Sequence, residues 1–143
     1  MTYDGEQEMT ASIKNVVVVG AGGMGALFGS ILSEGGLDVT LVDNDREHVD
    51  AIRKNGLQIS SLGGERYQQI KAEYHAGALA TADVVLVQCK GTATFDAANA
   101  MAHLAGTGAI FISFQNGLGN EDILAAHFGI ENVFGGFTSM AGA

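Results

Sequence analysis

Three glycines at the spacing Gly-x-Gly-x-x-Gly are the residues best suited to chemistry. Gly20, Gly22 and Gly25 directly follow a run of valines, Val16–Val19. The first glycine allows a tight turn, the second lets a pyrophosphate approach the backbone, and the third lets the next helix pack closely. A buried strand that ends in this spacing and turns into a helix predicts a dinucleotide-binding site. The residues expected to contact the cofactor there are Gly20, Ala21, Gly22, Gly23, Met24 and Gly25.

A carboxylate follows at the distance that such a site requires. The segment Asp38–Val42 is typical of a second buried strand, and Asp43 comes directly after it, about twenty residues past the glycines. There a carboxylate accepts hydrogen bonds from the ribose hydroxyls of an adenosine. Because its charge would oppose a 2′-phosphate, Asp43 favours NAD over NADP on electrostatic grounds.

Strands and helices alternate through most of the sequence. This alternation predicts an α/β fold with a doubly wound parallel sheet of the Rossmann type and right-handed crossovers. The exception is 57–74, which reads as a hairpin with a turn at Gly63–Gly64 and a return strand over 66–74. The expected helices are 23–34, one from Asn44 or Asp45 to Gly56, one from Thr92 or Thr94 to about Ala105, and 120–128. The further expected strands are 84–90, 109–114 and 133–137.

Two more polar residues follow strands of the expected sheet. Lys90 ends one strand and Asn116 lies in the loop after another. Ligands of such sheets bind outside the carboxyl ends of the strands, so we expect both residues to share an edge with the glycine turn and Asp43. A lysine there can donate to phosphate or ribose oxygens, and an asparagine offers both a donor and an acceptor.

Composition excludes several classes of protein. The chain has 143 residues and a net charge of −9, which argues against nucleic-acid binding. No apolar run reaches the length of a membrane span. The single cysteine, Cys89, suits a reducing cytoplasm and reads as a buried residue at a strand end, and the four histidines show no metal-ligand spacing. We expect a flexible tail over 1–12 and one domain over 13–143.

Several segments resemble the ketopantoate reductases (2-dehydropantoate 2-reductases). They are Gly20–Gly29, Gln88–Lys90 and, most specifically, Gln115–Glu121. The end of the chain, Phe134–Ala143, is similar to the family's Gly-x-Thr-Thr-x-Gly-Ala segment, and the resemblance covers residues 14–143. It implies NADPH-dependent reduction of the ketone of 2-dehydropantoate, a 2-oxo acid, to pantoate in the biosynthesis of pantothenate and coenzyme A.

The resemblance also implies roles for two residues. Lys90 matches the family's cofactor-contacting lysine, and Asn116 matches the asparagine that lies between cofactor and substrate and binds both. In the family, a second, helical domain supplies the catalytic lysine and a substrate-binding carboxylate. The sequence stops at Ala143, so we expect a cofactor-binding domain without catalytic residues of its own, which could form a homodimer through its uncovered apolar face.

Asp43 departs from the family pattern, since members that use NADPH tend to have a basic residue near this position. Arg46 could swing toward the site, but Asp43 favours NADH. Two alternatives remain open: a related hydroxyacid or opine-type dehydrogenase domain, and a non-catalytic nucleotide-binding module. The block Gln115–Glu121 argues against the module, because a pure sensor does not need a substrate-facing asparagine.

Overall fold

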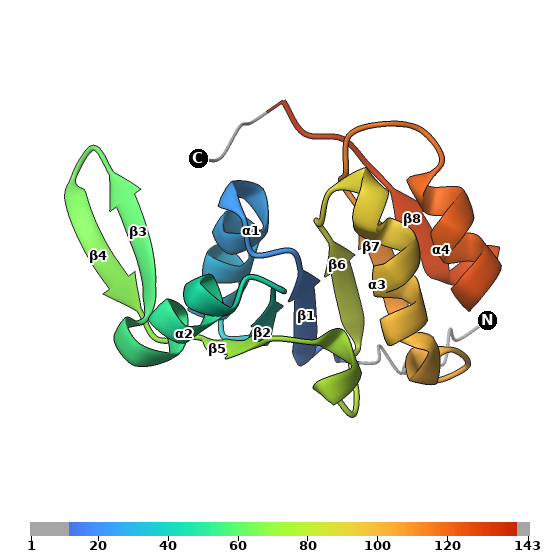
Figure 1. Cartoon of the computed structure of the whole chain (residues 1–143), viewed down its shortest axis with the longest axis horizontal. Helices are drawn as coiled ribbons and strands as arrows, with labels where there is room; N and C mark the ends of the chain where they lie inside the picture. Colours follow the sequence, from blue (N-terminus) through green and yellow to red (C-terminus); the bar gives the residue numbers. More distant parts are fainter. Residues whose placement is uncertain (1–11, 140–143) are drawn as a thin grey trace, which may run out of the picture.

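The centre of the structure is a sheet of six parallel strands (Figure 1). The computed structural model describes residues 12–139. The strands lie in the order β5-β2-β1-β6-β7-β8, so the chain winds outward from β1 in both directions. This is the doubly wound order of a Rossmann-type domain, which confirms the predicted fold class. The strands are β1 Asn15–Val19, β2 Asp38–Val42, β5 Lys71–Glu73, β6 Val84–Val87, β7 Ile110–Ser113 and β8 Val133–Gly135.

Helices cover both faces of the sheet. Side chains alternate between the faces of a strand, so Val16 and Val18 of β1 pack with α1 and α2, while Val17 and Val19 pack with α3 and α4. On the second face the rings of Phe111 and Phe128 stack at 3.7 Å. Both faces are therefore buried, which is why β1 reads as an unbroken apolar run. The helices are α1 Gly23–Glu34, α2 Arg46–Asn55, α3 Thr94–Ala100 and α4 Asn120–Phe128.

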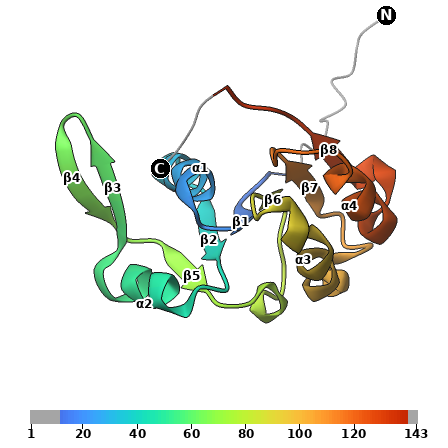
Figure 2. The same ribbon diagram turned by 45° about the horizontal axis from the view of Figure 1, so that its top comes forward.

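The region after the second helix differs from the prediction. The hairpin consists of β3, Leu57–Ser61, and β4, Gly64–Gln68, and its return strand ends at Gln68 instead of continuing to Tyr74. The segment Lys71–Glu73 forms β5, which pairs in parallel with β2 at the edge of the main sheet. The reason is burial, since Ala72 enters the core beside β2. The hairpin projects from one side of the domain (Figure 2), where Arg66 of β4 pairs with Glu34 of α1 and Gln68 bonds to Ser30.

Three other element ends differ from the prediction. The strand expected over 84–90, β6, ends at Val87, so Lys90 lies in the loop that follows it. The helix expected to reach about Ala105 begins as a 3₁₀ turn at Gly91–Ala93, becomes α3 and gives way to a second 3₁₀ turn, Ala102–Leu104. Met101 and Leu104 are both buried, and their spacing of three residues suits the tighter turn. The last strand stops at Gly135 instead of reaching Phe137.

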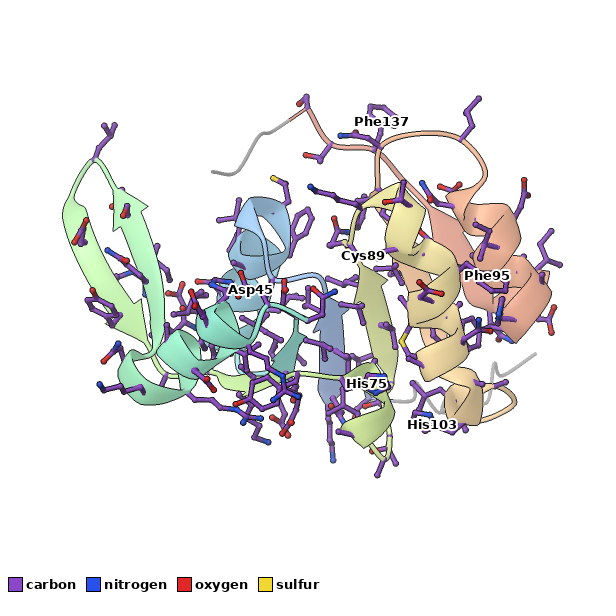
Figure 3. The ribbon with its side chains drawn as sticks, viewed as in Figure 1. Asp45, His75, Cys89, Phe95, His103 and Phe137 are labelled. Atoms are coloured by element: carbon purple, nitrogen blue, oxygen red, sulfur yellow. The ribbon has the colours of Figure 1, made fainter. Side chains whose placement is uncertain are left out.

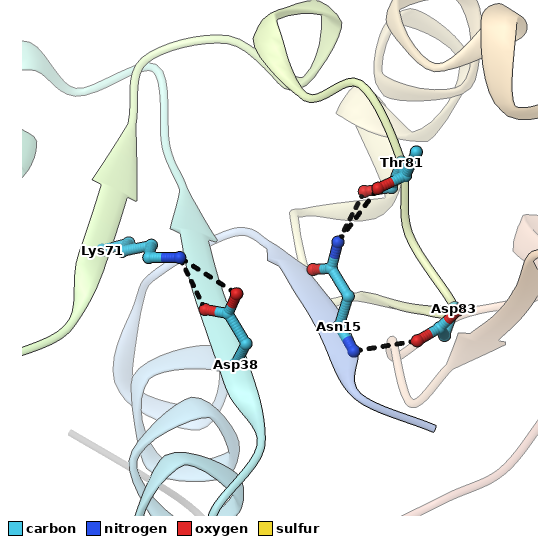
Figure 4. A network of polar contacts seen from close by, with 5 residues as sticks. All are labelled: Asn15, Asp38, Lys71, Thr81 and Asp83. Atoms are coloured by element: carbon cyan, nitrogen blue, oxygen red, sulfur yellow. Dashed lines mark hydrogen bonds and ion pairs between the residues drawn. The ribbon is translucent and has the colours of Figure 1, made fainter. Parts of the chain in front are cut away.

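Polar contacts join the amino ends of the strands (Figure 4). The Asp83 carboxylate accepts hydrogen bonds from the backbone N–H groups of Lys14 and Asn15, each at 2.9 Å. The Asn15 amide donates to Thr81, and Lys71 forms an ion pair with Asp38 at 2.8 Å. These contacts tie the loop before β6 to the start of β1, and β5 to β2.

Some predictions fall wholly or partly outside the described residues. Of the predicted tail over 1–12, only residue 12 is described, and of the family-like segment 134–143, the last four residues are not. The domain limits of 13–143 stay a prediction. Across residues 12–139, every helix is too short or too polar to cross a membrane.

Candidate functional site

A cleft of about 550 Å³ opens beyond the carboxyl ends of β1, β2 and β6. Gly20 and Gly22 of the glycine turn, Asp43 and Lys90 all line it. These residues come from three separate places in the sequence, and the parallel strand order brings their strand ends together. Tyr74 and His75, which follow β5, form part of the wall on the Asp43 side.

The three glycines of the turn meet different surroundings. At Gly20, where φ is +99°, an added Cβ would lie 2.5 Å from the Cys89 backbone nitrogen. At Gly25 it would lie 1.8 Å from the Gly20 carbonyl oxygen. At Gly22 it would meet no atom within 4 Å. The first and third glycines are thus required by packing, whereas the second leaves open space beside the backbone, as the approach of a phosphate requires.

The remaining residues of the turn are Ala21, which precedes α1, and Gly23 and Met24, which begin it. The helix begins at Gly23, and Gly22 precedes it without a side-chain cap. Ala21 is buried, and Met24 is half-buried. The first N–H groups of an α-helix have no partner within the helix, so this end of α1 offers donors and a positive dipole to an anion.

Asp43 is bound to the glycine turn itself. Its Oδ2 accepts a hydrogen bond from the Ala21 backbone N–H at 2.8 Å, and its Oδ1 accepts one from the backbone N–H of Asp45 at 2.9 Å. The carboxylate is half-buried, and each oxygen keeps a further lone pair for a ribose hydroxyl. Asp43 therefore orients the turn and lines the cleft at the same time.

His48 is a residue of this site that the sequence did not single out. Its ring nitrogen Nε2 donates to the Ala21 carbonyl oxygen at 2.7 Å, from the first turn of α2. Asp45 caps that helix by accepting from the backbone N–H of His48 at 3.2 Å, which holds the ring near the turn. The backbone N–H of Ala21 is thus bonded to Asp43, and its carbonyl oxygen is bonded to His48. The Asp45 cap was readable in the sequence, but the target of the His48 ring depends on tertiary contact.

Arg46 forms no ion pair with Asp43 in the described part of the chain. Its guanidinium lies 4.7 Å from the centre of the Tyr74 ring, and that of Arg53 lies 4.3 Å from the same ring. The Tyr74 hydroxyl donates to Asp50, and this bond is the main cause of a raised pKa of Tyr74. Cation–π contact with Tyr74 accounts for the position of Arg46. The Arg46 guanidinium therefore lies over a residue of the cleft wall, Tyr74, without an ion pair to Asp43.

Lys90 and Cys89 form the wall of the cleft that follows β6. Lys90 is exposed, as expected of a lysine available to a ligand. Cys89 lies at the end of β6 beside α3 (Figure 3). Burial raises the pKa of the Cys89 thiol above its usual value of 9.0. The thiol is therefore protonated at neutral pH, although Cys89 is half-buried and not fully buried as predicted.

Asn116 is exposed at the neighbouring strand end, and it is not among the residues that line the cleft. A chain of hydrogen bonds, partly or fully buried, holds its loop. Gln115 Nε2 donates to the Cys89 carbonyl oxygen at 2.7 Å and to Thr94 Oγ1 at 2.8 Å. Thr94 donates in turn to Asn120 Oδ1, and Asn120 Nδ2 donates to the Asn116 carbonyl oxygen at 3.2 Å. The network joins the ends of β6 and β7, although the sequence indicated only Asn116.

The other histidines bond to nearby backbone or side-chain groups. His127 contacts the Ile123 carbonyl and Asn99, and His75 accepts from the backbone N–H of Gly77. Within the part of the chain that the structure describes, no three His, Cys, Asp or Glu side chains gather as metal ligands.

The fold and the cleft together define the Rossmann class of nucleotide-binding domains. The family model "Ketopantoate reductase PanE/ApbA" matches residues 16–143. The chain belongs to this family.

Named relatives agree with this assignment. The chain is 35% identical to the 2-dehydropantoate 2-reductase of Halobacterium salinarum over 129 residues, which are 90% of this chain and 42% of that protein. It is 33% identical to the 2-dehydropantoate 2-reductase of Pyrococcus abyssi, over 87% of this chain and 39% of the relative. The chain thus spans about two fifths of the length of these relatives.

Solved structures show the same fold. The 2-dehydropantoate 2-reductase from Geobacter metallireducens superposes with a TM-score of 0.74 at 33% identity, over 84% of this chain and 40% of that one. A ternary structure of D-mandelate dehydrogenase with NADH and anilino(oxo)acetate superposes with a TM-score of 0.82 at 27% identity, over 88% and 41%. In both cases the similarity covers less than half of the solved chain.

Proposed function

We propose that this chain is the cofactor-binding part of an NADH-dependent reductase of 2-oxo acids. The observation that carries the proposal is the cleft in which the open face of Gly22, the Asp43 carboxylate and the Lys90 ammonium meet. A dinucleotide needs a donor-rich cradle for its pyrophosphate and an acceptor for its ribose hydroxyls, and these residues supply both.

Each residue has a role in this proposal. The turn from Gly20 to Gly25 holds the pyrophosphate against the first N–H groups of α1, and Asp43 accepts from the adenosine ribose. Lys90 donates to phosphate or ribose oxygens from the opposite wall. Asn116, held by Asn120 and the network around Gln115, contacts the cofactor and the substrate together. The bound cofactor supplies hydride to the ketone carbon, and we assign proton donation to no residue of this chain.

Two observations favour NADH over NADPH. The Asp43 carboxylate would repel a 2′-phosphate, and Arg46, whose guanidinium contacts the Tyr74 ring, makes no ion pair with Asp43 among the described residues. A dehydrogenase of the same fold, D-mandelate dehydrogenase, has been solved with NADH. NADPH remains the choice implied by the resemblance to ketopantoate reductases.

The substrate we favour is 2-dehydropantoate, because relatives at 33–35% identity are named 2-dehydropantoate 2-reductases. The second candidate is another 2-oxo acid with a bulkier group, favoured by the similarity to D-mandelate dehydrogenase, whose structure holds anilino(oxo)acetate. Both candidates place the reacting carbonyl beside Asn116, so the proposed reaction class is the same.

Calorimetric titration of the chain with NADH and with NADPH tests the proposal. We expect NADH to bind more tightly. Replacing Asp43→Asn removes the charge but keeps an oxygen for the Ala21 N–H, so NADH affinity should fall about 10-fold, since a hydrogen bond to a charged group contributes about 1.5 kcal/mol or more. NADPH affinity should stay equal or rise in the same variant.

The matched control is Asp45→Asn, which alters a neighbouring carboxylate that caps α2. The ratio of the two affinities should not change in this control. A clear preference of the unmodified chain for NADPH would contradict the role of Asp43, and the absence of binding to either cofactor would overturn the proposed function.

A further inference from the structure

One buried side-chain atom in the cleft wall has no hydrogen-bond partner among the described residues. The side-chain nitrogen Nε2 of Gln88 is buried and makes no hydrogen bond within the part of the chain that the structure describes. Its residue lines the same cleft as the glycine turn and Lys90. An amide donor removed from water without an acceptor destabilises a folded protein, so such groups are rare and require an explanation.

Gln88 lies against the first glycine of the turn. Its backbone N–H donates to the Val19 carbonyl oxygen at 2.7 Å, and a Cβ at Gly20 would lie only 2.7 Å from the Gln88 carbonyl carbon. The strand β6 that precedes Gln88 is on the opposite side of β1 from β2, which carries Asp43. A dinucleotide that starts at Asp43 and crosses the turn therefore reaches Gln88 after its adenosine half.

A second glutamine at the next strand end shows the contrast. Gln115 follows β7, and its Nε2 donates both to the Cys89 carbonyl oxygen and to Thr94 Oγ1. That amide is satisfied by the protein and joins two loops. The same chemical group at Gln88 joins nothing within the described residues, although both lie at the carboxyl edge of the sheet.

We propose that Gln88 is a cofactor-binding residue whose side-chain amide donates to an oxygen of the pyrophosphate or of the ribose beyond it. The inference rests on the proposed binding of a dinucleotide. Rotation of the amide about its last torsion exchanges the positions of oxygen and nitrogen, so the donor can turn toward a ligand in the cleft. The bound dinucleotide then provides the hydrogen-bond acceptor that Gln88 Nε2 lacks within the described residues.

The test combines affinity and stability in one set of variants. Gln88→Met keeps the length of the side chain but removes the donor, and Gln88→Glu replaces the donor by an acceptor. Calorimetry with NADH, ADP-ribose and AMP measures affinity, and the Tm of the unliganded chain measures stability. Gln115→Met is the matched control for a buried glutamine that the protein does satisfy.

We expect Gln88→Met to bind NADH and ADP-ribose about 10-fold more weakly, with AMP unchanged, because AMP lacks the atoms beyond the first phosphate. Gln88→Glu should weaken both by more, through repulsion of the pyrophosphate. The Tm of unliganded Gln88→Met should be equal to or above that of the unmodified chain, whereas Gln115→Met should lower it.

Several results would overturn the inference. If the unmodified chain binds NADH clearly and both Gln88→Met and Gln88→Glu bind it equally well, the role of Gln88 is overturned. The proposed function would then still stand. A structural role would be shown by either of two results. The affinity for AMP could fall as much as the affinity for NADH, or the Tm of Gln88→Met could fall as much as the Tm of Gln115→Met. Failure of the unmodified chain to bind NADH would overturn the proposed function and this inference with it.

Discussion

The two ends of the central sheet carry hollows of similar size but opposite chemistry. At the amino ends a hollow of about 470 Å³ is lined by Lys71 and Asp38, which form an ion pair, and by Asn15, which bonds to Thr81. At the carboxyl ends the cleft of about 550 Å³ is lined by an exposed Lys90 and an unpartnered amide at Gln88. The two hollows are similar in volume, and they differ in that the carboxyl-end cleft contains a buried nitrogen, Gln88 Nε2, without a partner among the described residues.

This difference indicates separate roles for the two ends. Polar groups that bond to one another hold strands and loops in register but have little left to offer a ligand. Polar groups that have no protein partner can bind a ligand. When no ligand is bound, these groups destabilise the domain, because they are buried without a hydrogen bond. We therefore expect changes at the carboxyl end to alter binding, and changes at the amino end to alter stability alone.

The largest expected effect is at Gly22. Gly22→Val places a branched side chain in the open space beside the turn and should weaken NADH binding by about 100-fold, the equivalent of about two hydrogen bonds to phosphate of about 1.5 kcal/mol each. The Tm should change little, because an added Cβ meets no atom within 4 Å. Titration calorimetry and thermal unfolding measure the two effects.

Gly25→Ala is the matched variant in the same turn. Its Cβ would overlap the Gly20 carbonyl oxygen, at 1.8 Å, so the Tm should fall together with the affinity. We expect Gly22 to matter for binding and Gly25 to matter for packing. This expectation is wrong if the Gly22→Val variant unfolds, or if that variant binds NADH as tightly as the unmodified chain.

The next largest effect is a pH-dependent loss of stability when Asp83, at the amino ends of the strands, is replaced. The backbone N–H groups of Asn15 and Lys14 hold the pKa of Asp83 below its usual value of 3.8. A carboxyl whose pKa is lowered by folding stabilises the native state above its unfolded pKa, and this contribution is lost as the pH falls through the folded pKa. The Tm of Asp83→Asn should thus lie below that of the unmodified chain at pH 7, and the gap should shrink below about pH 3.8.

Thermal unfolding of both chains between pH 2 and pH 7 measures this gap. NADH affinity at pH 7 should be equal in the two chains, because Asp83 lies at the opposite end of the sheet from the cleft. A gap that stays constant with pH, or a loss of affinity, would contradict the division of roles.

The smallest expected effect is on the reactivity of Cys89. Because burial raises the pKa of its thiol, alkylation by iodoacetamide should be slow at pH 7 and should accelerate only above about pH 9. Cys89 lines the cleft and is the single cysteine of the chain, so labelling reports this wall directly. NADH should slow the reaction further, and mass spectrometry of the labelled chain measures the rate. Equal rates with and without NADH would place the ligand elsewhere.

Local patterns predicted the first βαβ unit of the fold well. The glycine turn, α1, β2 and Asp43 form one βαβ unit, in which adjacent residues dictate the strand, the turn and the helix. The Asp45 cap and the stop at Gly56 were readable for the same reason. In contrast, 71–73 looked like part of a hairpin, because pairing with β2 depends on a partner about thirty residues away.

What the sequence determined by itself is the class of the domain: buried strands, helices between them, and a glycine-rich turn between the first strand and the first helix. The tertiary structure decided which polar groups are used by the protein and which remain for a ligand. It bonded His48 and Asp43 to Ala21, placed Arg46 over Tyr74 and left the Gln88 amide unpartnered among the described residues. Hydrogen bonds between distant segments depend on how strands and helices pack, and no local pattern encodes that packing.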